Sequence, residues 1–193
     1  MGEMAAGMAH ELKNPLAALA GSIQLLREEL HARPSHERLI QIALRETSRL
    51  NDLLTDFLTF ARPPAGKRRP LRLDRAVSEI VALFERDGTC AGRIQIEKTM
   101  APDLWVAMDP VHLRQILWNL LLNAAEAIDG HGRIAVKVRA ARGDKAEIRV
   151  RDSGCGIPAE WMESIFNPFF TTKTEGTGLG LSVVHRLLES YDG

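Results

Sequence analysis

Apolar residues recur every three or four positions near the start of the chain, in two separate stripes. The first stripe ends at Leu30, and the second runs from Leu39 to Phe60. This spacing places apolar side chains on one face of a helix, so each stripe predicts one helix. Pro34 lies between the stripes and predicts the break. A hairpin of two helices cannot bury both stripes by itself, whereas a four-helix bundle formed by two copies can.

The segment ARPPAGKRRP separates this helical region from the rest of the chain. Its prolines, glycine and basic residues are typical of a linker, because proline cannot continue a helix. We expect its basic side chains to be solvated. The pattern therefore predicts a helical hairpin over residues 1–61, a linker over 62–70 and a second domain over 71–193.

The second domain mixes helical and strand-like patterns. Helices are expected over 75–86, 109–128 and 179–190, and strands over 93–100, 104–108, 133–142 and 145–152. The last two strands alternate apolar and polar residues on either side of a Gly-Asp pair, which predicts a β-hairpin. This order of elements indicates an α+β domain.

Composition narrows the classes of function. The 193 residues include 25 Lys and Arg and 25 Asp and Glu, and a chain without net charge is not built to coat nucleic acid or anionic lipid. Cys90 and Cys155 are far apart and lack metal-ligand spacing, so we expect reduced thiols. No apolar run approaches the roughly 20 residues of a membrane-spanning helix. We therefore expect no nucleic-acid partner and no membrane contact from this chain.

A histidine interrupts the first stripe, within the sequence MAAGMAHELKNPLAAL. At about 100° per residue, His10 is roughly 200° from Met8 and from Leu12, so its ring points away from the apolar face. A neutral imidazole is a competent nucleophile near about pH 7. Asn14 lies one turn further along the same face. An isolated surface histidine usually has no role, so whether His10 has a function depends on the other motifs of the chain.

Two segments combine polar side chains with local structure suited to a nucleotide. Asn119 and Asn123 share one face of the expected helix. Asp152 ends an expected strand, and Gly154 and Gly156 let the backbone turn sharply after it. A carboxylate there can accept a hydrogen bond from an exocyclic amine such as that of adenine. Each signal is weak alone, because an amide pair can pack or cap a helix and D-x-G-x-G can be an ordinary turn.

A third segment, NPFFTTKTEGTGLGLS, places Gly176, Gly178 and Gly180 directly before a helix. Backbone amides at a glycine-rich helix start suit phosphate oxygens, and Lys173 is close enough in sequence to help. The segment is not a Walker loop, since no Gly-Lys-Ser/Thr follows. It is not a Rossmann turn, because no strand leads directly into it.

In this order, the three segments resemble the N, G1, F and G2 boxes of the ATP-binding fold shared by gyrase, Hsp90, MutL and histidine kinases. HELKNPL resembles the H box of histidine kinases. From about Gly2 to Gly193 the chain is similar to the transmitter core of a two-component sensor histidine kinase of the nitrogen-regulator type. The resemblance implies an α+β fold, in which a helical hairpin forms a dimeric four-helix bundle and precedes an α/β-sandwich ATP-binding domain of the Bergerat, or GHKL, type.

For the helical hairpin, the resemblance implies that His10 accepts the γ-phosphoryl group of ATP and passes it to an aspartate in the receiver domain of a response regulator. Glu11 would orient the ring and accept its proton. Asn14 would orient water for dephosphorylation of the regulator, which adds a phosphatase activity. The implied location is the bacterial cytoplasm, with any membrane attachment lying elsewhere in the full-length protein.

For the second domain, the resemblance implies ATP and Mg²⁺ as cofactors. Asn123 would hold Mg²⁺ against the phosphates, and Asp152 would bind the adenine amine. Asn119 would face the phosphates; gyrase and Hsp90 carry a water-activating glutamate at this position, so its absence favours transfer over hydrolysis. Phe169 belongs to the F box. The implied nucleotide-binding set is Asn119, Asn123, Asp152, Gly154, Gly156, Ile157, Phe170, Lys173, Gly176, Thr177, Gly178, Leu179, Gly180 and Leu181.

The chain departs from the family pattern in two places. Glu126 stands where many members have a basic residue and Ala127 where an aromatic is common. Either Lys173 supplies the missing charge, or the nitrogen-regulator branch does without it. The chain ends at LLESYDG, where the family continues with a glycine and a final β-hairpin. We therefore expect a C-terminally incomplete domain with an exposed sheet edge. The alternative function is a degenerate or truncated kinase that acts as an ATP-binding and dimerisation module.

Overall fold

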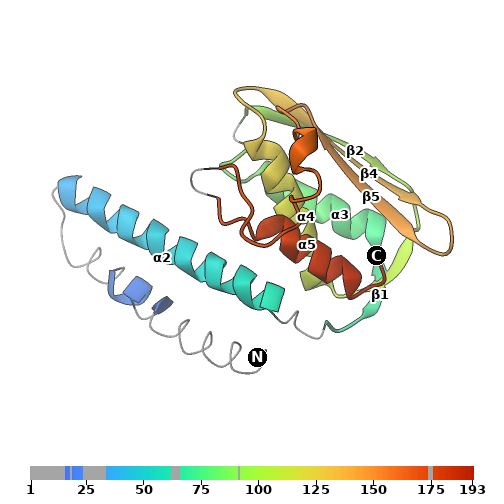
Figure 1. Ribbon diagram of the computed structural model, residues 1–193, viewed down its shortest axis with the longest axis horizontal. Helices are drawn as coiled ribbons and strands as arrows, with labels where there is room; N and C mark the ends of the chain where they lie inside the picture. Colours follow the sequence, from blue (N-terminus) through green and yellow to red (C-terminus); the bar gives the residue numbers. More distant parts are fainter. Residues whose placement is uncertain (1–15, 18, 24–33, 62–65, 91, 174–175) are drawn as a thin grey trace. The chain divides into compact units, whose positions relative to one another are not determined.

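The chain divides into two compact units, Met1–Pro64 and Ala65–Gly193 (Figure 1). The computed structural model describes residues 16–17, 19–23, 34–61, 66–90, 92–173 and 176–193. The division falls within the segment 62–70, which has the composition of a linker. His10, Glu11 and Asn14 lie outside the described residues.

The first unit is helical throughout its described part. Residues 16–17 and 19–23 are helical, and α2 spans Pro34–Ala61. Proline is well tolerated as the first residue of a helix, because its missing N–H would have no partner there. Large apolar side chains of α2 have exposed fractions between 39% and 64%: Leu39, Ile42, Leu50 and Phe57. This exposed apolar face is suited to packing against another helical surface.

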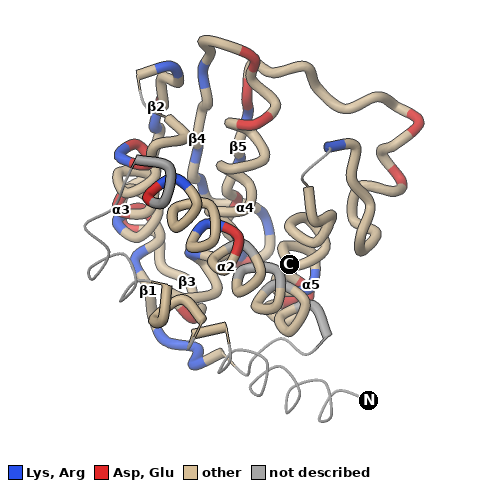
Figure 2. The backbone as a smooth tube through the Cα atoms, turned by 90° about the vertical axis from the view of Figure 1, so that its left-hand side faces the viewer, with Lys and Arg blue, Asp and Glu red and all other residues tan. Residues whose placement is uncertain are grey.

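The second unit contains two sheets. β1 (Arg69–Arg72) pairs antiparallel with β3 (Trp105–Met108), and β4 (Gly132–Ala140) lies between β2 (Ile94–Met100) and β5 (Ala146–Asp152). β4 runs parallel to β2 and antiparallel to β5. The helices α3 (Leu73–Glu85), α4 (Pro110–Glu126) and α5 (Gly180–Glu189) lie on one side of the three-stranded sheet (Figure 1, Figure 2). A short 3₁₀ helix, η1, spans Ala159–Trp161.

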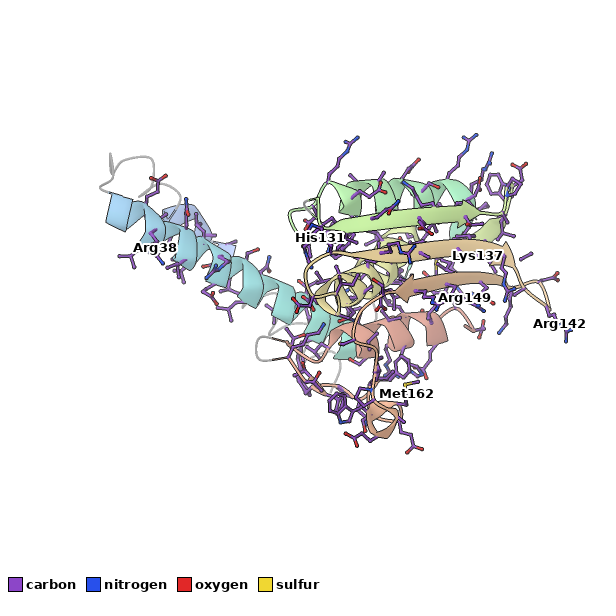
Figure 3. All side chains as sticks on the ribbon, turned by 90° about the horizontal axis from the view of Figure 1, so that it is seen from above. Arg38, His131, Lys137, Arg142, Arg149 and Met162 are labelled. Atoms are coloured by element: carbon purple, nitrogen blue, oxygen red, sulfur yellow. The ribbon has the colours of Figure 1, made fainter. Side chains whose placement is uncertain are left out.

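The core lies between these helices and the sheet. β4 alternates as the sequence predicts: Val136 and Val138 are 1% exposed, whereas Lys137 between them is exposed on the open face (Figure 3). Burying each such side chain stabilises the fold by about 1.5–3 kcal/mol. The helices contribute Val77, Val81, Phe84, Leu113, Leu117, Leu121, Val183 and Leu187. This arrangement confirms the predicted α+β class.

The sequence pattern does not predict β1. Arg69 and Pro70, expected in the linker, are its first residues and lie opposite Met108 and Ala107. A short basic segment with a proline shows no alternation, and it becomes a strand only through pairing with β3. Among the described residues, β5 is paired on one side only. No described helix combines the length and the apolar character needed to cross a bilayer.

A polar cluster, which we call the α4 clasp, fixes the beginning of α4. Its members are Lys67, Arg68, Asp109, His112 and Tyr191. Asp109 caps α4, since its carboxylate accepts hydrogen bonds from the N–H groups of Val111 at 2.8 Å and Lys67 at 2.7 Å. These hydrogen bonds hold the pKa of Asp109 below its ordinary value.

Tyr191 joins α4 to the residues that follow α5. Its hydroxyl accepts from the Asp109 N–H at 3.2 Å and lies 2.8 Å from Nδ1 of His112, which is 3% exposed. The Arg68 guanidinium lies 4.9 Å from the centroid of the Tyr191 ring. The clasp therefore holds the helix that carries Asn119 and Asn123.

We expect Tyr191→Phe to lower the free energy of unfolding by about 1–3 kcal/mol, because it leaves a buried ring nitrogen and a backbone N–H without their partner. Urea unfolding monitored by tryptophan fluorescence measures the change. The phenylalanine ring retains the contact with Arg68, so the comparison isolates the hydroxyl. An unchanged unfolding midpoint would show that the Tyr191 hydroxyl adds no stability.

Candidate nucleotide-binding site

The two asparagines of α4 lie beside the beginning of α5. Asn119 and Asn123 are one turn apart and half-buried. An ideal Cβ built on Gly180 would lie 3.3 Å from Asn119 Oδ1 and 3.7 Å from Asn123 Nδ2. The first residue of α5 therefore packs against both amides, and α4 and α5 lie side by side in Figure 1.

The beginning of α5 offers backbone N–H groups. Leu179, at the N-cap, makes no side-chain capping hydrogen bond. The first N–H groups of a helix lack intrahelical acceptors and carry partial positive charge. The Leu179 side chain is 2% exposed and belongs to the core, and its own N–H donates to Thr177 Oγ1 at 3.2 Å. This anchored turn beside two side-chain amides suits the oxygens of a phosphate group.

The loop after β5 is fixed against the far end of α4. Asp152 Oδ1 accepts a hydrogen bond from the Gly154 N–H at 2.8 Å, and the Cys155 N–H donates to the Ala127 carbonyl at 3.0 Å. An ideal Cβ on Gly154 would lie 2.4 Å from the Ala127 carbonyl oxygen, so this close approach requires glycine. The loop therefore orients the Asp152 carboxylate relative to α4.

Phe169 and the glycine-rich turn before α5 form one local structure. The Phe169 N–H donates to the Gly178 carbonyl at 2.9 Å, and both residues have positive φ, 66° and 68°. An ideal Cβ on Gly178 would lie 2.4 Å from the Phe169 carbonyl carbon. The Phe170 ring packs edge-on to Trp161, with centroids 6.5 Å apart. A non-glycine residue with positive φ, such as Phe169, is strained, and such residues cluster at ligand-binding sites.

Lys173 connects this segment to α4. Its Nζ donates to Asn123 Oδ1 at 3.1 Å and forms an ion pair with the Glu126 carboxylate. The Lys173 and Glu126 side chains are 39% and 41% exposed, so the pair is open to solvent. The Asn123 amide oxygen therefore already interacts with a cation.

The remaining residues proposed from the sequence surround these contacts. Gly156 and Ile157 are exposed in the loop after Asp152, and Leu181 is half-buried in the first turn of α5. An ideal Cβ on Gly176 would lie 2.3 Å from Thr171 Oγ1, so Gly176 packs within its own segment.

Sequence reasoning assigned no role to Glu126 or Ser153. Ser153 Oγ accepts from the Arg133 N–H at 3.0 Å and anchors the Asp152 loop to β4. Glu126 is three residues after Asn123 and therefore shares its helix face, a signal that could have linked the two. The contact of Glu126 with Lys173 joins segments distant in sequence, and no spacing rule predicts it.

We expect Gly154→Ala to destabilise the second unit by about 1–3 kcal/mol, because the new methyl group would overlap the backbone of Ala127. Gly88→Ala is the matched control, since an ideal Cβ there meets nothing within 4 Å. Thermal unfolding of both variants measures the difference. Equal midpoints would contradict the close packing of the Asp152 loop on α4.

Two family models match the chain. Residues 1–66 match the His Kinase A (phospho-acceptor) domain, and residues 108–193 match the Histidine kinase-, DNA gyrase B-, and HSP90-like ATPase family. Sensor histidine kinase ZraS of Escherichia coli O157:H7 is 38% identical over 194 residues, which cover 100% of this chain and 42% of that protein. Signal transduction histidine-protein kinase AtoS of Escherichia coli K12 is 34% identical over 197 residues, covering 100% and 32%. The chain thus spans less than half the length of these relatives.

Solved structures give the same similarity in three dimensions. Full-length ShkA in complex with AMPPNP superposes with a TM-score of 0.83 at 26% identity, over 98% of this chain and 41% of that one. Histidine kinase ThkA in complex with the response regulator TrrA has a TM-score of 0.68 at 31% identity, over 100% and 55%.

Proposed function

Because this chain belongs to the sensor histidine kinases, as the core in which a phosphoacceptor domain precedes an ATP-binding domain, we propose that it transfers the γ-phosphoryl group of ATP to His10. From His10 the group passes to an aspartate of a response regulator. The proposal is supported mainly by the packing of Asn119 and Asn123 against the beginning of α5, where no side chain caps the helix. ATP as substrate is consistent with an activity in the cytoplasm.

Different residues of the site bind the adenine and the phosphates of the nucleotide. The Asp152 carboxylate accepts a hydrogen bond from the adenine amine, while its bond to the Gly154 N–H keeps it oriented. The amide of Asn119 and the first N–H groups of α5 bind and orient the phosphate oxygens. Phosphoryl transfer depends mainly on such positioning and on neutralised charge.

The donor set at Asn123 fits Mg²⁺. Its Oδ1 accepts a hydrogen bond from the Lys173 ammonium at 3.1 Å, so this oxygen is directed at a position that a cation can occupy. Mg²⁺ commonly takes one or two protein oxygens and completes its coordination with phosphates and water. Asn123 is therefore the residue that would hold the ion, which supplies positive charge to the phosphates when bound.

His10 is the nucleophile of the proposed transfer. A neutral ring nitrogen attacks the γ-phosphorus, a P–N bond forms, and the bond to the bridging oxygen breaks, so ADP leaves with the electron pair. Glu11 orients the ring and accepts its proton. A carboxylate oxygen of the regulator's aspartate then attacks the same phosphorus, the P–N bond breaks, and His10 regains its electron pair while Glu11 returns the proton to the ring.

Partners follow from the same proposal. The exposed apolar face of α2 supports a homodimer through a four-helix bundle, and the ThkA–TrrA complex supports a receiver domain as acceptor. Asn14 would orient a water molecule for dephosphorylation of that receiver. Glu126 in place of a basic residue supports membership of the nitrogen-regulator branch.

Incubation of the purified chain with γ-labelled ATP and Mg²⁺ tests the function. We expect a protein-bound label that is lost in acid and retained in base, as a phosphoramidate requires, and no label from α-labelled ATP. A chain that binds ATP but takes up no label would instead be an ATP-binding and dimerisation module.

A further inference from the structure

Lys173 occupies a specific place in the site. Its ammonium donates to Asn123 Oδ1 at 3.1 Å and is paired with the carboxylate of Glu126. Asn123 and Glu126 lie nearly one turn apart on α4, whereas Lys173 comes from the segment between Phe170 and α5. Two groups of one helix thus hold one cation from another segment.

The amide oxygen that Lys173 contacts is the one assigned above to Mg²⁺. Two cations on one oxygen repel each other, and the repulsion is larger near a protein surface than in bulk water. An ammonium group and Mg²⁺ therefore compete for Asn123 Oδ1. Glu126 favours the ammonium, because its carboxylate pairs with Lys173 on the same helix face.

We propose that Glu126 is a positioning residue that holds the Lys173 ammonium on Asn123 Oδ1, in competition with Mg²⁺. Lys173 would leave Asn123 Oδ1 and turn toward the phosphates when Mg²⁺ and a nucleotide are bound. Glu126 thereby sets how strongly nucleotide affinity depends on Mg²⁺. This inference rests on the proposed function, which assigns Asn123 to the ion.

The expected effect is modest. Both side chains are about two-fifths exposed, at 39% and 41%, so solvent screens their attraction. Exposed ion pairs change equilibria by about two- to fivefold. An effect of this size is measurable as a ratio of two dissociation constants for the same protein.

The experiment measures the Kd of AMPPNP for the full chain by calorimetry, with excess Mg²⁺ and with EDTA. The readout is the Kd in EDTA divided by the Kd in Mg²⁺. We expect Glu126→Gln to raise this ratio about two- to fivefold, because the ammonium that competes with Mg²⁺ for Asn123 Oδ1 is no longer held there by the carboxylate. In a Lys173→Met background, Glu126→Gln should leave the ratio unchanged.

Asp129→Asn is the matched control, since it removes an exposed carboxylate just beyond the end of the same helix. We expect it to leave the ratio at the wild-type value. A ratio changed to the same extent by Glu126→Gln in the Lys173→Met background, or by Asp129→Asn, would overturn the proposal and indicate a general charge effect. Wild-type binding with a ratio that Glu126→Gln does not change would overturn the inference alone. Wild-type protein that binds no AMPPNP would overturn the proposed function as well.

Discussion

Replacing His10 with glutamine is expected to reduce phosphoryl incorporation from γ-labelled ATP to background. An amide nitrogen is not a competent nucleophile, whereas a neutral imidazole is one near about pH 7. The nucleotide site belongs to the other unit, Ala65–Gly193, so we expect the affinity for ATP to stay within about twofold of wild type. Filter-bound label and calorimetric ATP binding measure the two quantities.

His31→Gln is the control for this substitution. It removes a histidine from the same unit but from outside the HELKNPL motif. We expect this variant to be labelled as wild type is. Label retained by His10→Gln, or lost equally from both variants, would contradict the assignment of His10.

Asp152→Asn is expected to weaken ATP binding by about 10- to 100-fold, since a hydrogen bond to a charged acceptor is lost in a formed site. The asparagine carbonyl can still accept from the Gly154 N–H, which Asp152 does at 2.8 Å, so the loop should keep its conformation. The other carboxylate oxygen becomes an NH₂ group, which faces the donor amine of adenine. Calorimetric titration with ATP measures the loss.

A comparison of ATP with GTP tests whether Asp152 recognises the adenine amine. Guanine presents a carbonyl where adenine presents its amine, so we expect the preference for ATP over GTP to fall in Asp152→Asn. Asp144→Asn, in the loop between β4 and β5, is the control, because asparagine tolerates the positive φ of 54° found there. Unchanged ATP affinity in Asp152→Asn, with wild-type unfolding, would contradict adenine recognition by this residue.

Sequence periodicity predicted the elements that build the core. The alternation of residues 133–142 and 145–152 predicted a hairpin, and the structure has β4 and β5 antiparallel with Val136 opposite Val150. The alternation of apolar and polar residues predicts these strands because one face of each strand is buried. β1 has no such pattern, and among the described residues its only strand partner is β3.

The site was predictable where its residues share one element. Asn119 and Asn123 are four residues apart on α4, and Asp152 ends β5, so spacing and position were enough. The contact of Lys173 with Glu126 and the pairing of His112 with Tyr191 join distant segments. His112 also lies among the apolar residues of α4, where sequence alone indicates only a core position. Such contacts depend on how the helices pack, which the spacing of residues does not encode.

In the proposed reaction, ATP bound at the nucleotide site phosphorylates one of the six histidines of the chain. Mass spectrometry of peptides prepared at alkaline pH after reaction with ATP and Mg²⁺ tests it most directly, because phosphohistidine survives in base. We expect a single phosphorylated peptide, with the phosphoryl group on the imidazole of His10. A phosphoryl group on His131, on His185 or on a serine or threonine, with His10 unmodified, would contradict it.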